Sequence, residues 1–188
     1  MTNLESAILY SCILKGFGDC SRLDKLDYVR LERNGCNSDD AANFSGLDTL
    51  NHDIQVAIYF DVRCKVNQEC IDSLENANIH QLDISGNQNL NLSIIKNLNI
   101  ISFISGGEID WNGLQEMPNL KKINIRSLNI SDLTPVASLT NIEELDISNT
   151  NVTDLSPLKD MPNLKKLIAE NCNIDDWSPV SDIDEVIK

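Results

Sequence analysis

The feature that most constrains this chain is a repeat of 22 residues in its C-terminal half. Three consecutive segments superimpose without a gap, at residues 120–141, 142–163 and 164–185. With the first Leu or Ile of each segment as position 1, apolar residues recur at positions 1, 4, 6, 11, 14, 17 and 20. This pattern predicts a stack of similar coils, each of which buries its apolar side against its neighbours.

Each repeat carries one signal for a strand and one for a turn. The spacing 4, 6 has a period of two, as in Leu145 and Ile147, and predicts a short strand whose alternate side chains enter a core. Asp at position 13 and Pro at position 16 predict a short helical turn on the opposite side of the coil. The carboxylate can cap free N–H groups there, and proline fits the first turn. These residues are Asp110, Asp132, Asp154, Asp176, Pro135, Pro157 and Pro179.

The same template extends back to the beginning of the chain with less fidelity, and it predicts a single domain over 1–188. We expect about eight repeats, near 4–25, 26–53, 54–78, 79–97, 98–119, 120–141, 142–163 and 164–185. In the repeat at 98–119, Ile101 and Phe103 take positions 4 and 6. The register between residues 37 and 78 stays open, because its strand could start at Ile54 or at Ala57.

The run NISDLTPVASLTNIEELDISNTNVTDLSPLKDMPNLKKL, residues 129–167, resembles leucine-rich repeats of the bacterial internalin type. The shared features are the 22-residue period and the segment DLSPL at 154–158. The resemblance implies an α/β solenoid, a right-handed superhelix with a curved parallel sheet on its concave face. It further implies short 3₁₀ turns and loops on the convex face, and a concave face that grips other proteins.

The net charge of −14 narrows the class of partner. Binding to nucleic acid or to an anionic membrane needs clustered Lys and Arg, so the charge argues against both and favours a protein partner, with a basic one fitting best. The chain as given shows no signal peptide and no apolar run of 18 residues. We therefore expect a cytoplasmic protein, with leaderless secretion or delivery into a host cell as the alternative.

The chemistry-bearing residues predict no catalysis, no cofactor and no metal site. A catalytic thiol would need a histidine base, and His52 and His80 lie in no recognisable motif. Neighbouring position-13 carboxylates would lie about 5 Å apart, the separation of a retaining glycosidase pair, but capping explains their placement. The six cysteines follow no disulfide or zinc spacing, so we expect all to be thiols. They are Cys12, Cys20, Cys36, Cys64, Cys70 and Cys172.

Other conspicuous residues have structural interpretations. Cys12 and Cys172 fall at position 9, where a small polar side chain turns inward to bond the backbone. Trp111 and Trp177 share position 14 and should fill the core under the convex turn. Opposite charges on neighbouring strand starts predict a solvated ladder of cross-strand pairs. Its members are Lys121, Lys122, Lys165, Lys166, Glu143 and Glu144.

Residue choice on the concave face is the best evidence about binding. Positions 3, 5, 7 and 8 face this surface and have no packing task. Tyr and Arg are enriched at interface hot spots, so we expect binding to centre on the Tyr- and Arg-rich first repeats, although an ordinary mixed surface remains the alternative. The predicted binding residues are Tyr10, Tyr28, Arg30, Glu32, Arg33, Tyr59, Asp61, Arg63, Gln81, Asp83, Ile100, Ile104 and Arg126.

These observations favour a non-enzymatic protein-interaction module. An acidic inhibitor or immunity-type protein that neutralises a basic enzyme or toxin is one alternative, and a targeting domain of a larger assembly is another. We also expect the two ends to differ. Leu4 already belongs to a repeat, which predicts a bare first coil that pairs with a second copy or with the partner, and the alternative is a first strand that frays or tucks its own side chains inward. At the other end, DIDEVIK at 182–188 predicts a short amphipathic cap.

Overall fold

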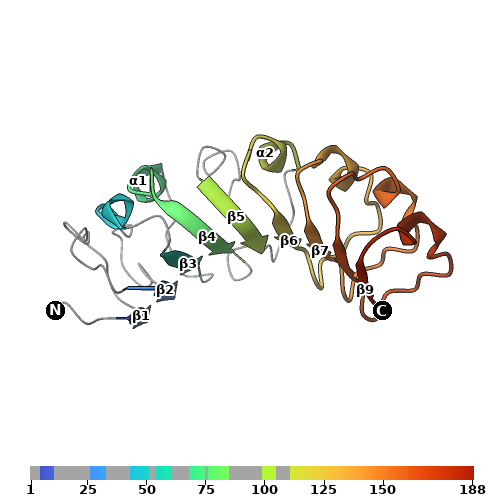
Figure 1. Cartoon of the computed structure of the whole chain (residues 1–188), viewed down its shortest axis with the longest axis horizontal. Coiled ribbons are helices and arrows are strands. Elements are labelled where there is room, and N and C mark those ends of the chain that lie inside the picture. Colours follow the sequence, from blue (N-terminus) through green and yellow to red (C-terminus); the bar gives the residue numbers. More distant parts are fainter. Residues whose placement is uncertain are drawn as a thin grey trace.

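A computed structural model describes residues 5–10, 26–32, 43–50, 54–60, 68–74, 76–84, 99–104 and 111–188. Nine strands lie in these residues and form one parallel sheet in chain order, from β1 to β9 (Figure 1). The strands are β1 Ser6–Tyr10, β2 Tyr28–Glu32, β3 Gln55–Tyr59, β4 Asn78–Asp83, β5 Asn99–Ile104, β6 Lys122–Asn124, β7 Glu144–Asp146, β8 Lys166–Ile168 and β9 Glu185–Ile187.

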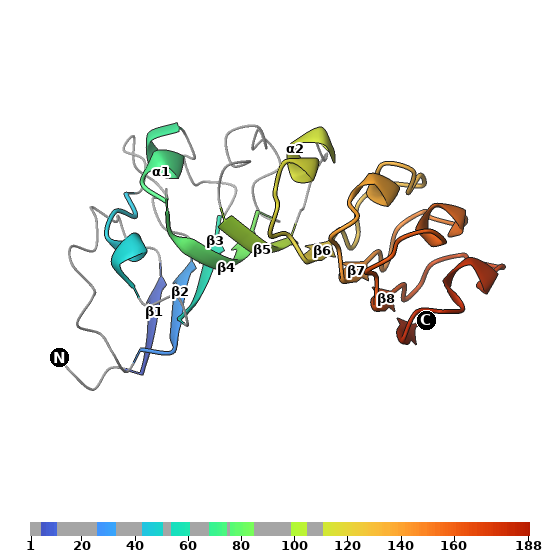
Figure 2. The same cartoon turned by 45° about the horizontal axis from the view of Figure 1, so that its top comes forward.

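Short helical segments lie on the other side of the coils from the sheet. The sheet follows the inner curve of an arch and the helical segments its outer curve, with the two chain ends at opposite feet (Figures 1 and 2). The predicted solenoid, with a concave sheet and convex 3₁₀ turns, is therefore confirmed. The segments are η1 Leu47–Thr49, α1 Gln68–Asp72, α2 Trp111–Gln115, η3 Val136–Ser138, η4 Ser156–Leu158 and η5 Ser178–Val180.

A single apolar core runs the length of the stack between the sheet and the convex segments. Leu145 and Ile147 both enter it and are fully buried, as the period of two predicts. Trp111 and Trp177 are partly buried and pack against this core, which confirms their structural role. Each inner coil of the stack is covered by a neighbour on both sides, so the core is continuous through the described residues.

The register of β5 differs from the one predicted. Phe103 pairs with Leu82, and Ile100 pairs with Ile79, so Ile100 rather than Leu98 is the first position of its repeat. Ile100 is 0% exposed, and its predicted place on the concave surface is wrong. Ile101, predicted to face inward, is half-buried instead. Two adjacent isoleucines satisfy the apolar pattern equally well, so pairing with the neighbouring strands decides which one is buried.

The open register of β3 is settled by its two neighbours. Val56 pairs with Val29, and Ile58 pairs with Leu82, so the side chains that enter the core are Val56, Ile58 and Phe60. The strand itself starts at Gln55, so neither predicted start, Ile54 or Ala57, is right, although the start at Ala57 correctly placed Tyr59 among the residues that face the concave side. Phe60 meets Phe44 edge to face, with ring centroids 6.1 Å apart, beneath the turn that leads into η1.

The last residues form a strand instead of the predicted amphipathic cap. In β9, Val186 pairs with Leu167 of β8, just as Leu167 pairs with Leu145 of β7. The segment thus starts a further coil, and the described sheet has nine strands where about eight repeats were expected. A three-residue strand needs only one inward apolar side chain, and Val186 supplies it between two residues that face the concave side.

The capping role of the position-13 aspartates is confirmed for three of them. The backbone N–H of Ser156 donates to Asp154 Oδ1 at 2.8 Å, and equivalent bonds join Thr134 to Asp132 and Ser178 to Asp176. Hydrogen bonds from the side chains and backbone N–H groups of Thr134 and Ser156 lower the pKa of Asp132 and Asp154, and those from the backbone N–H and side chain of Ser178 lower the pKa of Asp176, because they stabilise the charged carboxylate. Asp110 lies outside the described residues.

A second device shapes the bend between each strand and the convex side. Ser127, Asn149 and Asn171 stand at the same repeat position and have φ of 63°, 57° and 57°. Asparagine tolerates this left-handed conformation better than most residues. One position later, Cys172 Sγ donates to the Ile147 carbonyl at 3.2 Å, which confirms the inward polar role predicted for Cys172; Cys12 lies outside the described residues.

We expect Asp154→Ala to lower the melting temperature, because the substitution removes the acceptor for the Ser156 N–H. The pKa of Asp154 lies below its ordinary value of 3.8, so its stabilising effect is present above that pH and is lost as pH falls through the lower folded value. Thermal unfolding at several pH values tests this. Asp160→Ala, an exposed carboxylate of the same coil, is the control. A difference between wild type and Asp154→Ala that grows in acid would contradict the capping role.

Candidate functional site on the concave sheet

Two rows of side chains cross the concave face from one end of the sheet to the other, and in both each member pairs with the next across neighbouring strands. We call the row that contains Arg30 the central row. It comprises Ile8, Arg30, Ala57, Gln81, Ser102, Lys122, Glu144, Lys166 and Glu185. The row changes character along its length, from apolar and hydrogen-bonding groups on β1 to β5 to alternating charges on β6 to β9.

Five residues of β2, β3 and β4 form what we call the Arg30 cluster: Tyr28, Arg30, Glu32, Tyr59 and Gln81. Arg30 Nη2 donates to Glu32 Oε1 at 3.0 Å, while its guanidinium lies over the Tyr59 ring, 4.4 Å from the centroid. Gln81 Nε2 donates to the Tyr59 hydroxyl at 2.8 Å. The sequence predicted all five as concave binding residues, and the structure brings them together on adjacent strands.

The charge states of this cluster are fixed near neutral pH. The hydrogen bond to Glu32 raises the pKa of Arg30, so the guanidinium stays charged. Burial raises the pKa of Tyr59, so its phenol stays protonated. Arg30 Nε is buried and its N–H has no acceptor among the described residues, which leaves one donor of the guanidinium unsatisfied. An arginine stacked on a tyrosine with spare donors suits the recognition of another protein's surface.

A pocket of about 230 Å³ opens beside the Arg30 cluster on the same face. It spans β2 to β6, where the strands begin, and its walls are largely apolar. Its lining residues are Tyr28, Gln55, Val56, Ala57, His80, Gln81, Ile101, Ser102 and Lys122. Ala57 lies between Arg30 and Gln81 on the central row and is 4% exposed. Because its side chain is small, it leaves room for the hollow above it.

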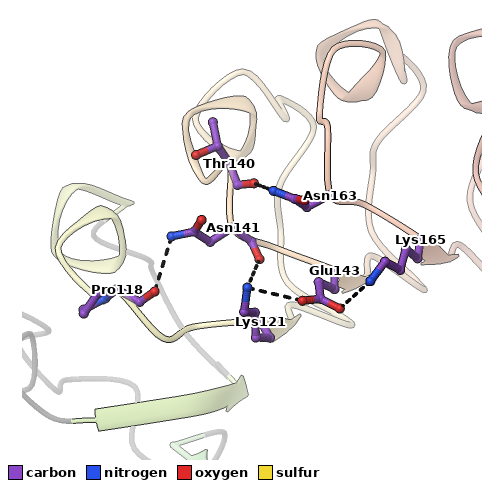
Figure 3. A network of polar contacts seen from close by, with 7 residues as sticks. All are labelled: Pro118, Lys121, Thr140, Asn141, Glu143, Asn163 and Lys165. Atoms are coloured by element: carbon purple, nitrogen blue, oxygen red, sulfur yellow. Dashed lines mark hydrogen bonds and ion pairs between the residues drawn. The ribbon is translucent and has the colours of Figure 1, made fainter.

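The C-terminal half of the concave face is a ladder of paired charges. Lys121 and Lys165 both reach Glu143, at 3.2 and 2.9 Å, and the three side chains run across successive coils (Figure 3). On the central row, Lys122 meets Glu144 at 2.8 Å and Lys166 meets Glu185 at 3.0 Å. The cross-strand ladder predicted from the sequence is confirmed. Its charges neutralise one another, and exposed pairs of this kind contribute little to stability.

Asparagines tie the same coils together at the edge of the ladder. Asn141 Nδ2 donates to the Pro118 carbonyl at 3.3 Å, and Asn163 Nδ2 donates to the Thr140 carbonyl at 2.9 Å (Figure 3). Lys121 Nζ also donates to the Asn141 carbonyl at 3.4 Å. These side chains form hydrogen bonds between neighbouring coils, so they are engaged within the protein itself.

The remaining predicted residues are distributed as follows. Asp83 and Ile104 pair across β4 and β5 and are half-buried on the concave side, next to Tyr59. Arg126 lies farther along, where it reaches Glu170 at 3.8 Å. Tyr10 ends β1 opposite Glu32, and its side chain lies outside the described residues. Arg33, Asp61 and Arg63 also lie outside them.

Sequence reasoning missed several residues that line the pocket, above all His80 and Ile101. Both fall at position 2 of their repeats once the β5 register is corrected, and position 2 was not counted among the concave binding positions. An alignment that matched Leu82 with Phe103, and not with Ile101, would have placed both His80 and Ile101 on the surface. Gln55, Ala57 and Lys122 required the β3 register and the cross-strand neighbours, which the sequence left open.

The sequence and fold match known proteins. A model described as leucine-rich repeats, two copies, matches residues 140–182. Two solved structures from Listeria monocytogenes are similar: internalin C2, with 23% identity and a TM-score of 0.58, and the internalin inlF, with 18% identity and 0.52. The alignments cover 88% and 92% of this chain, and 72% and 64% of those chains. No curated protein matches the chain in sequence.

The fold is a leucine-rich-repeat solenoid. It is similar to the fold of the two internalins, and the segment DLSPL at 154–158 lies within the region that the leucine-rich-repeat model matches. Asp132, Asp154 and Asp176 have lowered pKa values and serve their own turns, so these three carboxylates do not supply the raised-pKa acid that a glycosidase needs. Among the described residues, no three His, Cys, Asp or Glu side chains gather as metal ligands, and no helix could span a membrane.

Proposed function

We propose that this leucine-rich-repeat protein binds a partner protein through its concave sheet, with the Arg30 cluster and the adjoining pocket at the centre of the contact. The observation that carries the proposal is the contrast between the two halves of the concave face. On β2 to β4, Arg30 stacks on Tyr59, and Tyr28 lines the adjoining, mostly apolar hollow. On β6 to β8, the charges pair with one another. Interface hot spots favour the first kind of surface.

A continuous parallel sheet also suits a large partner. Its strands present one side of every coil in register, so a partner can contact many coils at once. The half-exposed aromatic and arginine side chains can bury large areas while their polar tips keep hydrogen bonds. Ile8, 48% exposed at the β1 end of the central row, extends the apolar character of this half toward the first strand. Pairing of that edge with a second copy stays a prediction.

An inhibitor of a basic enzyme is the second candidate, and the distribution of charge favours it. The chain carries −14, and the convex turns of the last three full coils present Asp132, Asp154 and Asp176 at their surface. A field of this sign would speed the approach of a basic protein, and the effect would weaken as salt screens it. An association rate that falls steeply with ionic strength supports the inhibitor, while a flat dependence supports a general interaction module.

The proposed concave contact is tested by substitution once the partner has been captured from the native cell lysate and purified. We expect Arg30→Ala and Tyr28→Ala each to weaken partner binding by about 30-fold, a hot-spot effect of about 2 kcal/mol, in isothermal titration calorimetry. Lys166→Ala is the matched control on the same row, because it removes a cation from the paired ladder, and it should change affinity by less than about threefold. If binding survives Arg30→Ala but is lost in Ile168→Ala, the contact lies at the opposite end of the sheet.

A further inference from the structure

We infer that the pocket between β2 and β6 is an anchor site for one apolar side chain of the partner, with an adjacent Asp or Glu carboxylate of the partner bound at the pocket rim by Lys122. The inference rests on the proposed concave binding function and names the chemistry of the segment that binds. Three features of the pocket support it: the apolar floor, the donors of His80 and Lys122, and the positive charge of Lys122 at the rim.

The floor of the pocket calls for an apolar occupant. Ala57 and Ile101 contribute aliphatic surface, and Tyr28 also lines the pocket. Ile101 is half-buried on the exposed side of β5, while its neighbour Ile100 fills the core. An apolar side chain that enters the pocket would remove both its own surface and that of Ile101 from water, and such burial is the main source of affinity at small anchor sites.

Two polar groups that line the pocket, those of His80 and Lys122, can donate to a ligand. The Val56 N–H donates to His80 Nδ1 at 3.3 Å, so a neutral His80 ring carries its proton on Nε2. Within the described part of the chain, that Nε2–H has no acceptor. Lys122 Nζ contacts Glu144 at 2.8 Å, which engages one of its three donors. A ligand that places acceptor atoms over the apolar floor therefore satisfies groups that the free protein leaves to water.

The sign of charge at the rim selects a carboxylate over an ammonium group. Lys122 lines the pocket, and its side chain is 53% exposed, so it can turn from Glu144 toward a ligand at little cost. A basic side chain in the same place would face Lys122 directly, with the proton of His80 beside it. The oxygen atoms of a carboxylate can accept hydrogen bonds from both Lys122 and His80. A hydrogen bond between charged groups is stronger than one between neutral groups.

The probe is the capped peptide acetyl-Ala-Leu-Glu-Ala-amide, titrated into the ¹⁵N-labelled protein and followed by NMR. We expect weak saturable binding, with a Kd of about 1 mM, and shift changes centred on the amides of Ala57, Gln81 and Ser102. Replacing the Leu of the peptide by Ala should weaken binding about tenfold, because the anchor is lost. Replacing its Glu by Gln should weaken binding about threefold to tenfold.

Two variants of the protein locate the peptide. Ser102→Phe fills the pocket from β5 and should abolish the shift changes, while an unchanged melting temperature shows that the fold is intact. Lys122→Gln should weaken the Glu peptide to the level of the Gln peptide and leave the Gln peptide unaffected. Lys166→Gln is the matched control, since Lys166 occupies the same row and pairs with Glu185 at 3.0 Å but does not line the pocket. It should change neither peptide's affinity.

The outcomes separate this inference from the proposed function. If the peptide shifts other amides, binds Lys122→Gln as tightly as wild type, or prefers Lys to Glu beside its Leu, the anchor site as described is wrong. If Arg30→Ala still weakens the natural partner in that case, the concave contact stands without the anchor. If the peptide binds as described but neither Arg30→Ala nor Ser102→Phe affects the partner, the pocket has the stated chemistry and the proposed use of the concave face is wrong.

Discussion

Ile100→Ala is expected to cost about 2–5 kcal/mol of folding free energy, the range for emptying a fully buried isoleucine site. Ile100 is 0% exposed between the cores of the β4 and β5 coils, paired with Ile79. Neighbouring side chains cannot collapse into the cavity without moving the strands they belong to. In a stack of coils, a defect in a central coil weakens its contacts with the coils on both sides. Urea unfolding, with the midpoint and the m value both measured, gives the loss.

Ile101→Ala is the matched control, one residue away on the same strand. Ile101 is half-buried and faces the pocket, so truncation should cost about 1 kcal/mol or less. The two substitutions remove the same atoms, and the difference between them measures the register of β5 alone. Equal losses, or a larger loss for Ile101→Ala, would mean that Ile101 faces the core, as the repeat pattern alone predicted, and would remove the pocket wall on which the anchor site depends.

Cys70 is expected to react with iodoacetamide about a thousandfold more slowly than an ordinary cysteine in the native protein at pH 8. Cys70 is 0% exposed in α1, and burial raises the pKa of its thiol from 9.0 to about 12. The thiolate is the reactive form, and a shift of this size reduces its population by about three orders of magnitude. Peptide mapping by mass spectrometry after timed labelling follows each cysteine separately.

Cys172 is the internal control for this measurement, because its thiol is only partly buried and should label faster than that of Cys70. In denaturant the two should label equally. The raised pKa also links stability to pH: the unfolded thiol ionises near 9.0 and the folded thiol near 12, so this contribution is complete below pH 9 and is lost as pH rises through the folded value. Native labelling of Cys70 at the rate of Cys172 would show that α1 opens readily.

Both described cysteines are thiols, in agreement with the prediction made for all six. Cys12, Cys20, Cys36 and Cys64 lie outside the described residues, and for them the prediction stands untested. The thiol at Cys172 has a further structural task, since its sulfur lies 3.6 Å from the hydroxyl of Thr150 one coil earlier. The inward position thus holds a polar contact between coils, whichever small residue occupies it.

The sequence by itself determined the architecture and the devices that repeat in it. A 22-residue period with apolar residues at fixed positions requires stacked coils, because only neighbouring coils can cover each apolar side. The roles of Asp154 and Pro157 could be predicted because they depend only on residues close by in the chain: Asp154 bonds to Ser156, and Pro157 lies in the first turn of η4. The Lys and Glu ladder could be predicted for the same reason, because a constant period makes equal positions neighbours.

Only the tertiary structure decided the features that depend on contacts between repeats of unequal length, namely the β5 register, the last strand and the pocket. The choice between Ile100 and Ile101 rests on the pairing of β5 with β4 and β6, and both residues meet the apolar pattern. The last residues became a strand because β8 offered Val186 a partner in Leu167. The pocket exists only where Tyr28, Ala57 and Ile101 come together from three strands far apart in the chain. A repeat pattern specifies which side of a strand is buried, but the register between irregular coils, set by packing, specifies which side chains meet on the other side.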